Sequence, residues 1–167
     1  EEEVVPQEEV TEPPTEVAEA DIFSQDINDQ VGDQVLDSIV SVSTVSSDDT
    51  LEQIEKELIA IAKKNKVELM TFQSNAEHEL VDRIQAGKEE KVSCILFNPG
   101  AFTHTSVALR DAILGVDIPL IEIHISNIFN REAFREKSYF SDIAVGIIYG
   151  FGEQGYKAAL ELAIERF

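Results

Sequence analysis

Two side chains that can exchange protons stand at the end of an expected β-strand. Residues 118–124 (IPLIEIH) read as a strand, and Glu122, His124 and Ser126 follow one another there at intervals of two. Residues two apart in an extended chain point to the same side, so we expect these three to share one face. A carboxylate beside an imidazole fixes the orientation of the ring and favours its protonated form. The spacing therefore indicates acid–base chemistry at this strand end.

A second group of polar side chains follows the preceding expected strand, residues 92–97 (VSCILF). Asn98 comes directly after it, and His104 stands where the next helix is expected to begin. Arg131 and Arg135, four apart in a later loop, could hold hydroxyls or a carboxylate. A lone histidine at a strand end is usually structural, but this combination at successive strand ends favours a binding pocket for a polar small molecule.

The elements that must position these residues alternate along the chain. Apolar runs with β-branched residues predict strands, and apolar residues spaced by three and four predict helices. Such alternation is typical of a parallel sheet covered on both faces, whose ligands bind beyond the carboxyl ends of the strands. Residues 21–38 permit a short amphipathic helix. The expected strands are 39–45, 67–72, 92–97, 118–124 and 143–149, and the expected helices are 50–64, 75–85, 105–114 and 153–167, with one helical turn within 126–137.

Charge and composition exclude several classes of function. The 167 residues hold 13 Lys and Arg against 33 Asp and Glu, a formal charge of -20, which disfavours binding to nucleic acid or to anionic membranes. No apolar run approaches the roughly 20 residues that span a bilayer. A single cysteine, Cys94, excludes an intrachain disulfide and a cysteine-based zinc site. His104 and His124 could bind zinc, but no third ligand lies at a matching spacing.

The negative charge is concentrated at the N-terminus. Residues 1–55 contain no Lys or Arg and carry -17, whereas the remaining 112 residues carry only -3. Residues 1–20, rich in Glu and Pro, are predicted to be a disordered acidic leader that spaces or solubilises, or that docks to a partner. We expect residues 21–49 to be an atypical N-terminal segment that could supply the first strand at 39–45, and residues 50–167 to form the main domain.

Four stretches of the main domain resemble type II 3-dehydroquinate dehydratase: FQSNAEHELVDRI, FNPGAFTHTSVALRDAI, IEIHISN and REAFREKSYFSDIAVGIIYGFGEQGY. The resemblance runs from about Thr50 to Phe167. It implies a flavodoxin-like fold with a five-stranded parallel sheet in the order 2-1-3-4-5, and trimers that assemble into dodecamers. It also implies a cytoplasmic lyase that dehydrates 3-dehydroquinate to 3-dehydroshikimate in the shikimate pathway of aromatic amino-acid biosynthesis, with no metal or cofactor.

The resemblance also implies a role for each matching residue. His124 would be the general acid that protonates the departing hydroxyl, with Glu122 beside it. Ile125 and Ser126 would bind the substrate carboxylate. Asn98, His104 and Arg135 would bind its ring hydroxyls. Asp111 would act across a trimer interface on a neighbour's His104.

The N-terminal part departs from the family pattern. In the family, the first strand ends in an LNGPN motif, and a mobile lid with an REP triplet and a YG pair follows it. The Tyr of the lid is the base, and the Arg of the lid activates that Tyr. The Asn of the LNGPN motif positions a water. None of these motifs is present at that place, where Ser46 aligns with the Tyr. Tyr139, Tyr149 and Tyr156 all belong to downstream motifs. If residues 39–45 fill the first strand, only 46–49 connect it to the helix, which leaves no room for a lid.

Three hypotheses follow. The chain could be a lyase of reduced activity, with its base supplied by another group such as an Asp of residues 21–37. It could be a binding or scaffold protein that keeps the pocket without turnover. It could also be a chimeric or engineered N-terminus on a dehydratase body.

Overall fold

The computed structural model describes residues 38–43 and 48–167. By its contacts the chain divides into two units, residues 1–33 and 34–167, and every described residue belongs to the second. The predicted leader at 1–20 and nearly all of the helix considered at 21–38 lie outside the described residues. Within the described part, no helix is long and apolar enough to cross a bilayer.

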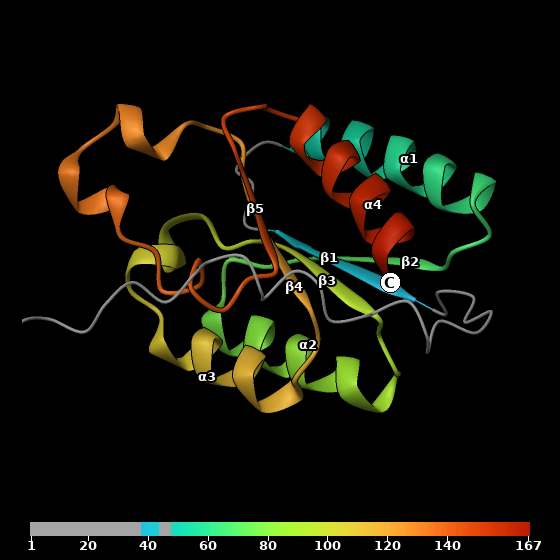
Figure 1. Ribbon diagram of the computed structural model, residues 1–167, viewed down its shortest axis with the longest axis horizontal. Coiled ribbons are helices and arrows are strands. Elements are labelled where there is room, and N and C mark those ends of the chain that lie inside the picture. Colours follow the sequence, from blue (N-terminus) through green and yellow to red (C-terminus); the bar gives the residue numbers. More distant parts are fainter. Residues whose placement is uncertain (1–37, 44–47) are drawn as a thin grey trace, which may run out of the picture. The chain divides into compact units, whose positions relative to one another are not determined.

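Five parallel strands form one sheet in the order β2-β1-β3-β4-β5. Helices cover both of its faces (Figure 1), so the predicted α/β fold and the strand order are confirmed. Because all strands run in the same direction, their carboxyl ends meet at one edge of the sheet, where ligands bind in such folds. The strands are β1 Ile39–Ser43, β2 Leu69–Gln73, β3 Cys94–Asn98, β4 Leu120–His124 and β5 Gly146–Tyr149.

Strand β1 lies between β2 and β3, the interior position that a sheet of this order gives to its first strand. Ile39 pairs with Leu69 on one side and Cys94 on the other, and Ser43 pairs with Gln73 and Asn98. All five β1 residues are buried. β1 thus lies within the strand expected at 39–45, of which residues 44 and 45 lie outside the described part. Only four residues, 44–47, separate it from the first helix.

The described part of the chain forms four α-helices, which are divided between the two faces of the sheet. Figure 1 shows α1 and α4 on one face, and α2 and α3 on the other. The sheet therefore has an apolar core on each side, and alternate strand residues contribute to each: Ile121 and Ile123 of β4 pack toward α1 and α4, and Leu120 toward α2 and α3. The helices are α1 Asp48–Lys64, α2 Glu77–Glu89, α3 Val107–Val116 and α4 Gln154–Arg166. The described residues also form the short 3₁₀ helices η2 Gly100–His104, η3 Ile128–Asn130 and η4 Ala133–Glu136.

Most elements begin or end a few residues away from the sequence-based expectation, and for two of them the reason is local. The helix expected from residue 105 begins at Val107, because η2 ends at His104 and the Ser106 hydroxyl caps α3 by accepting from the Leu109 amide at 2.9 Å. The strand expected from residue 143 begins only at Gly146. The Phe140 carbonyl accepts from two amides, those of Ile143 and Ala144, so the chain turns before β5 begins.

The single cysteine belongs to the core beneath α1 and α4. Cys94, at the start of β3, is fully buried. Burial raises the pKa of its thiol to about 12.

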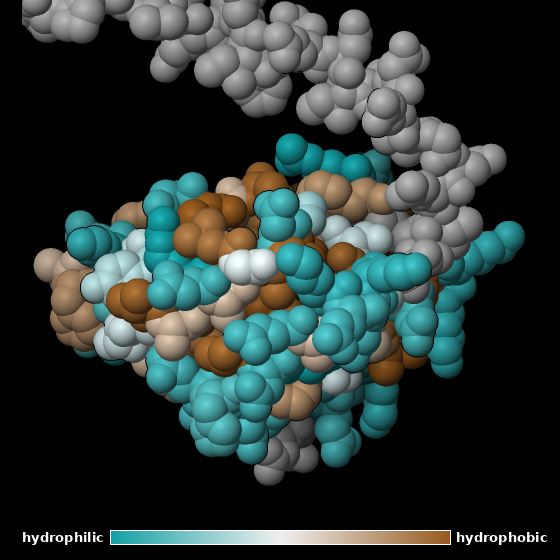
Figure 2. All heavy atoms as spheres, turned by 90° about the horizontal axis from the view of Figure 1, so that it is seen from below, coloured by the Kyte–Doolittle hydropathy of each residue, from teal (hydrophilic) through white to brown (hydrophobic). Residues whose placement is uncertain are grey.

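Outside the core, apolar patches interrupt the hydrophilic surface in the view from the side of α2 and α3 (Figure 2).

Candidate active site

The predicted acid–base pair forms on β4. His124 Nε2 lies 2.8 Å from Glu122 Oε1, and both side chains are buried, Glu122 completely. Strand alternation places them on the side of the sheet that Leu120 faces, toward α2 and α3. Because a carboxylate accepts and the ring nitrogen donates, Nε2 carries a proton and Nδ1 is the ring nitrogen that Glu122 does not engage.

Three hydroxyl groups complete the surroundings of Glu122. Ser138 and Thr103 donate to Oε1 at 2.7 and 2.8 Å, and Ser141 donates to Oε2 at 2.6 Å. These donors come from η2 and from the turn before β5, so the carboxylate joins both segments to β4. Sequence reasoning missed all three, because they are distant in the sequence and become neighbours only through the fold.

The net effect of this environment is to keep Glu122 ionised. Burial by itself raises the pKa of Glu122, but hydrogen bonds from His124, Ser141, Ser138 and Thr103 together outweigh it, and the pKa falls below its ordinary 4.5. Four donors surrounding one carboxylate satisfy its acceptor capacity, which is the condition under which a buried charge is tolerated. The pair is therefore built to hold an imidazole or an imidazolium next to a permanent negative charge.

Replacing Glu122 with Gln is expected to lower the free energy of unfolding by about 2 kcal/mol at pH 7, because hydrogen bonds to a charged acceptor become bonds to a neutral one. Since the folded-state pKa of Glu122 is depressed, its stabilisation is present above pH 4.5 and is lost as the pH falls below that value. The difference between wild type and Glu122→Gln should therefore shrink under acid conditions.

Urea unfolding at pH 7, at pH 5 and below pH 4.5 measures this difference. Glu161→Gln, on the exposed surface of α4, is the matched control and should change stability by less than about 0.5 kcal/mol. A wild-type minus Glu122→Gln difference that stays constant across these pH values would contradict the assignment.

Tyr149 lies against the face of His124. The strand register pairs the two residues across β4 and β5, and their rings stack with centroids 5.1 Å apart at 28°. The Tyr149 hydroxyl lies 2.9 Å from Ser141 Oγ. Burial raises the pKa of Tyr149, and the charge of Glu122 raises it further. Its position at a strand end is the signal that selected the other residues, and the same reasoning could have included it.

Asn98 is the last residue of β3, whereas we expected it directly after the strand, and it faces the opposite side of the sheet from Glu122. Its Nδ2 donates to the Tyr156 hydroxyl of α4 at 2.7 Å, and its Oδ1 accepts from the Gly100 amide at 3.2 Å. Asn98 is buried and is held at the edge where β1 and β3 end.

His104 and Arg135 share one aromatic neighbour. The His104 ring lies edge-on to Phe134 at 6.0 Å, and the Arg135 guanidinium lies 4.9 Å above the same ring. His104 Nδ1 is 2.8 Å from the Lys137 carbonyl, and Arg135 donates to Glu132 at 2.8 Å. The loop after β4 therefore folds back onto the residue that ends η2. This contact brings together two predicted ligands that lie far apart in the sequence.

Ile125 and Ser126 begin the loop that follows β4, beside the end of β5. The amides of Gly150 and Gly152 donate to the carbonyls of His124 and Ile125, both at 3.0 Å. Gly150 has a φ of +80°, and a Cβ there would lie only 3.1–3.3 Å from Asn127. Glycine is thus needed at 150 for the two loops to pack together, which positions the backbone of Ile125 and Ser126.

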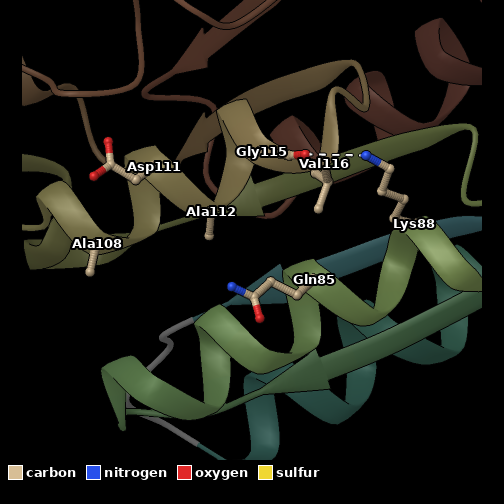
Figure 3. Close-up of a pocket in the computed structure, with 7 residues that line it drawn as sticks. All are labelled: Gln85, Lys88, Ala108, Asp111, Ala112, Gly115 and Val116. Atoms are coloured by element: carbon tan, nitrogen blue, oxygen red, sulfur yellow. Dashed lines mark hydrogen bonds between the residues drawn. The ribbon is translucent and has the colours of Figure 1, made fainter.

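Asp111 is exposed on α3. It lines a surface hollow between α2 and α3 (Figure 3). Its predicted role toward a neighbouring subunit concerns a contact between chains and stays a prediction. Elsewhere, among residues 38–43 and 48–167, no group of three or more potential ligand side chains could hold a metal ion.

This arrangement of residues has close relatives. The family model for dehydroquinase class II matches residues 42–164. The chain belongs to the class II dehydroquinases. A 3-dehydroquinate dehydratase of Hahella chejuensis is 57% identical over 118 residues, which cover 71% of this chain and 80% of the relative. A 3-dehydroquinate dehydratase 1 of Pseudomonas aeruginosa is 56% identical over 117 residues, 70% of this chain and 80% of the relative.

Solved structures of the same family share the fold of this dehydroquinase. A type II dehydroquinase from Butyrivibrio crossotus superposes with a TM-score of 0.72 at 31% identity, covering 76% of this chain and 97% of the other. A type II dehydroquinase from Propionibacterium acnes gives 0.69 at 26% identity, covering 77% and 98%. The predicted family resemblance is therefore confirmed.

Proposed function

We propose that this dehydroquinase is a lyase that dehydrates 3-dehydroquinate to 3-dehydroshikimate, and that it does so slowly. The observation that carries the proposal is the buried Glu122–His124 pair, held by three further donors at the carboxyl end of β4. The names of the curated relatives support this activity over a purely binding or scaffold role.

His124 is the general acid in this proposal. When His124 is doubly protonated, the proton on Nε2 is bonded to Glu122 and the proton on Nδ1 is not. The Nδ1 proton passes to the departing hydroxyl. Glu122 stabilises the imidazolium and stays ionised throughout, as the hydrogen bonds that lower its pKa favour. The backbone amides of Ile125 and Ser126, with the Ser126 hydroxyl, hold the substrate carboxylate. His104 and Arg135 hold the ring hydroxyls, and no metal or cofactor takes part. Asn98 would join them only by giving up its bond to Tyr156 or to Gly100.

The slow rate follows from the missing base. Residues 44–47 are the whole connection between β1 and α1, where the family resemblance implies a lid. Tyr149 is no substitute, because burial raises its pKa and its hydroxyl is engaged by Ser141. Loss of a general base costs about 100- to 10,000-fold in rate. A base from residues 21–37 would reduce this deficit.

We further propose that the chain works in the cytoplasm as a homo-oligomer built from trimers, up to a dodecamer. The exposed position of Asp111 on α3 supports a role across a trimer interface, toward a neighbour's His104. Light scattering after size-exclusion chromatography gives the mass: a multiple of three chains is expected, and a monomer at micromolar concentration would contradict it.

The test of the function is the absorbance of the enone product when 3-dehydroquinate is added, with the Pseudomonas aeruginosa relative assayed beside it. We expect product formation slower than the relative's by about 100- to 10,000-fold. Calorimetric titration measures substrate binding separately. Binding without turnover would favour the scaffold hypothesis, and loss of both would contradict the presence of a formed site. Turnover equal to the relative's would contradict the proposal that the general base is missing.

A further inference from the structure

Glu122, His124, Tyr149 and Ser141 form a closed ring of contacts. His124 donates to one oxygen of Glu122, and Ser141 donates to the other at 2.6 Å. Ser141 also lies 2.9 Å from the Tyr149 hydroxyl, and the Tyr149 ring stacks on His124. The imidazole is therefore held along its edge by a hydrogen bond and across its face by an aromatic ring.

The direction of each hydrogen bond in the ring is determined. An ionised carboxylate only accepts, so the single proton of Ser141 goes to Glu122. Ser141 must then accept from Tyr149, whose hydroxyl is the donor. This chain of donors from Tyr149 through Ser141 to Glu122 allows one proton arrangement, and it stabilises the orientation of the carboxylate that His124 contacts.

Tyr149 makes a second aromatic contact besides the one with His124. Phe129 of η3 meets it edge-on, with centroids 5.4 Å apart at 84°. Rotation of the His124 ring about its Cβ–Cγ bond would break both the stack on Tyr149 and the bond to Glu122. Edge-to-face and stacked aromatic pairs are each worth about 0.5–1.5 kcal/mol beyond their burial.

We propose that Tyr149 and Ser141 are positioning residues that fix the His124 ring for proton donation, Tyr149 by stacking and Ser141 by holding Glu122. The catalytic consequence rests on the proposed function, but the positioning does not. Ser138 and Thr103 hold only Oε1 of Glu122, so Ser141 alone among these three hydroxyls fixes the second oxygen.

Proton NMR tests the positioning without any turnover. A buried Nε2 proton bonded to a carboxylate gives a downfield signal that exchanges slowly with water. We expect this signal in wild type and in the control Tyr139→Phe. In Ser141→Ala and Tyr149→Leu we expect exchange at least about tenfold faster, because the ring and the carboxylate become free to turn. Tyr149→Phe keeps the stack but loses the donor and should be intermediate.

Backbone amides of β3 are the internal reference, since global destabilisation would accelerate them too. Equal imidazole exchange in wild type, Ser141→Ala and Tyr149→Leu would overturn the proposal, as would absence of the signal in wild type. In the activity assay, both variants should form product about 10- to 100-fold more slowly, with substrate affinity changed less than about threefold. If the variants accelerate the imidazole exchange selectively but the wild type forms no product, the proposed function is refuted and the positioning role stands.

Discussion

Replacing residues 1–47 with the N-terminal segment of a family member that carries the LNGPN, REP and YG motifs is expected to raise turnover about 100- to 10,000-fold. The graft should fit because β1 lies between β2 and β3 and pairs with both along its whole length. The family's first strand would take its place, and the lid would emerge at the carboxyl ends of the strands, near His124. The junction before α1 leaves every described helix unchanged.

The enone absorbance assay measures this gain, and a second graft in which the lid Tyr is Phe is the matched control. The Phe graft keeps the same strand and lid but lacks the base, so its rate should stay near that of the native chain. Equal gains from both grafts would mean that the lid acts by another route. No gain from either, in a folded protein that binds substrate, would show that the present chain already possesses its base.

His124→Ala is expected to reduce product formation about 100- to 10,000-fold in the grafted protein, because a general acid contributes about that much. In the native chain the same change should remove the measurable rate. Glu122 would then remain buried with its three hydroxyl donors and no imidazole, so substrate binding should suffer less than turnover.

The matched control is His78→Ala, since His78 is exposed on the first turn of α2 and makes none of the site contacts described above. It should leave the rate within about twofold of its parent, as is usual for surface substitutions. A similar loss from both histidine variants would point to general destabilisation. An unchanged rate in grafted His124→Ala would remove His124 from the mechanism.

Most of the fold could be predicted because its signals are local. The β-branched run at Ile39–Ser43 and the apolar spacing in α1 identify their elements without tertiary information. The start of β5 could not be found in this way. The turn before it depends on the buried Phe140 and its carbonyl, whereas the residues after Phe140 look equally suited to a strand.

The site residues likewise divide into those with a local sequence signal and those brought in by the tertiary fold. Glu122 and His124 were predicted to share a face because strand geometry dictates it at a separation of two residues. Thr103 and Ser141 were missed, because their proximity to Glu122 results from how two loops return to the end of β4. The orientation of Asn98 could have been expected from alternation along β3, whose residues Cys94 and Leu96 pack toward α4.

The burial of Cys94 makes its thiol a natural probe of how often the core opens. With the thiol enclosed at the start of β3 and its pKa near 12, alkylating reagents can reach a reactive thiolate only after the sheet separates from α1 and α4. Since the sequence has no other cysteine, each modified molecule records one such opening event. The labelling rate of the unaltered protein thus reports how often its interior is exposed, and binding of 3-dehydroquinate to the closed form would be visible as a slower rate.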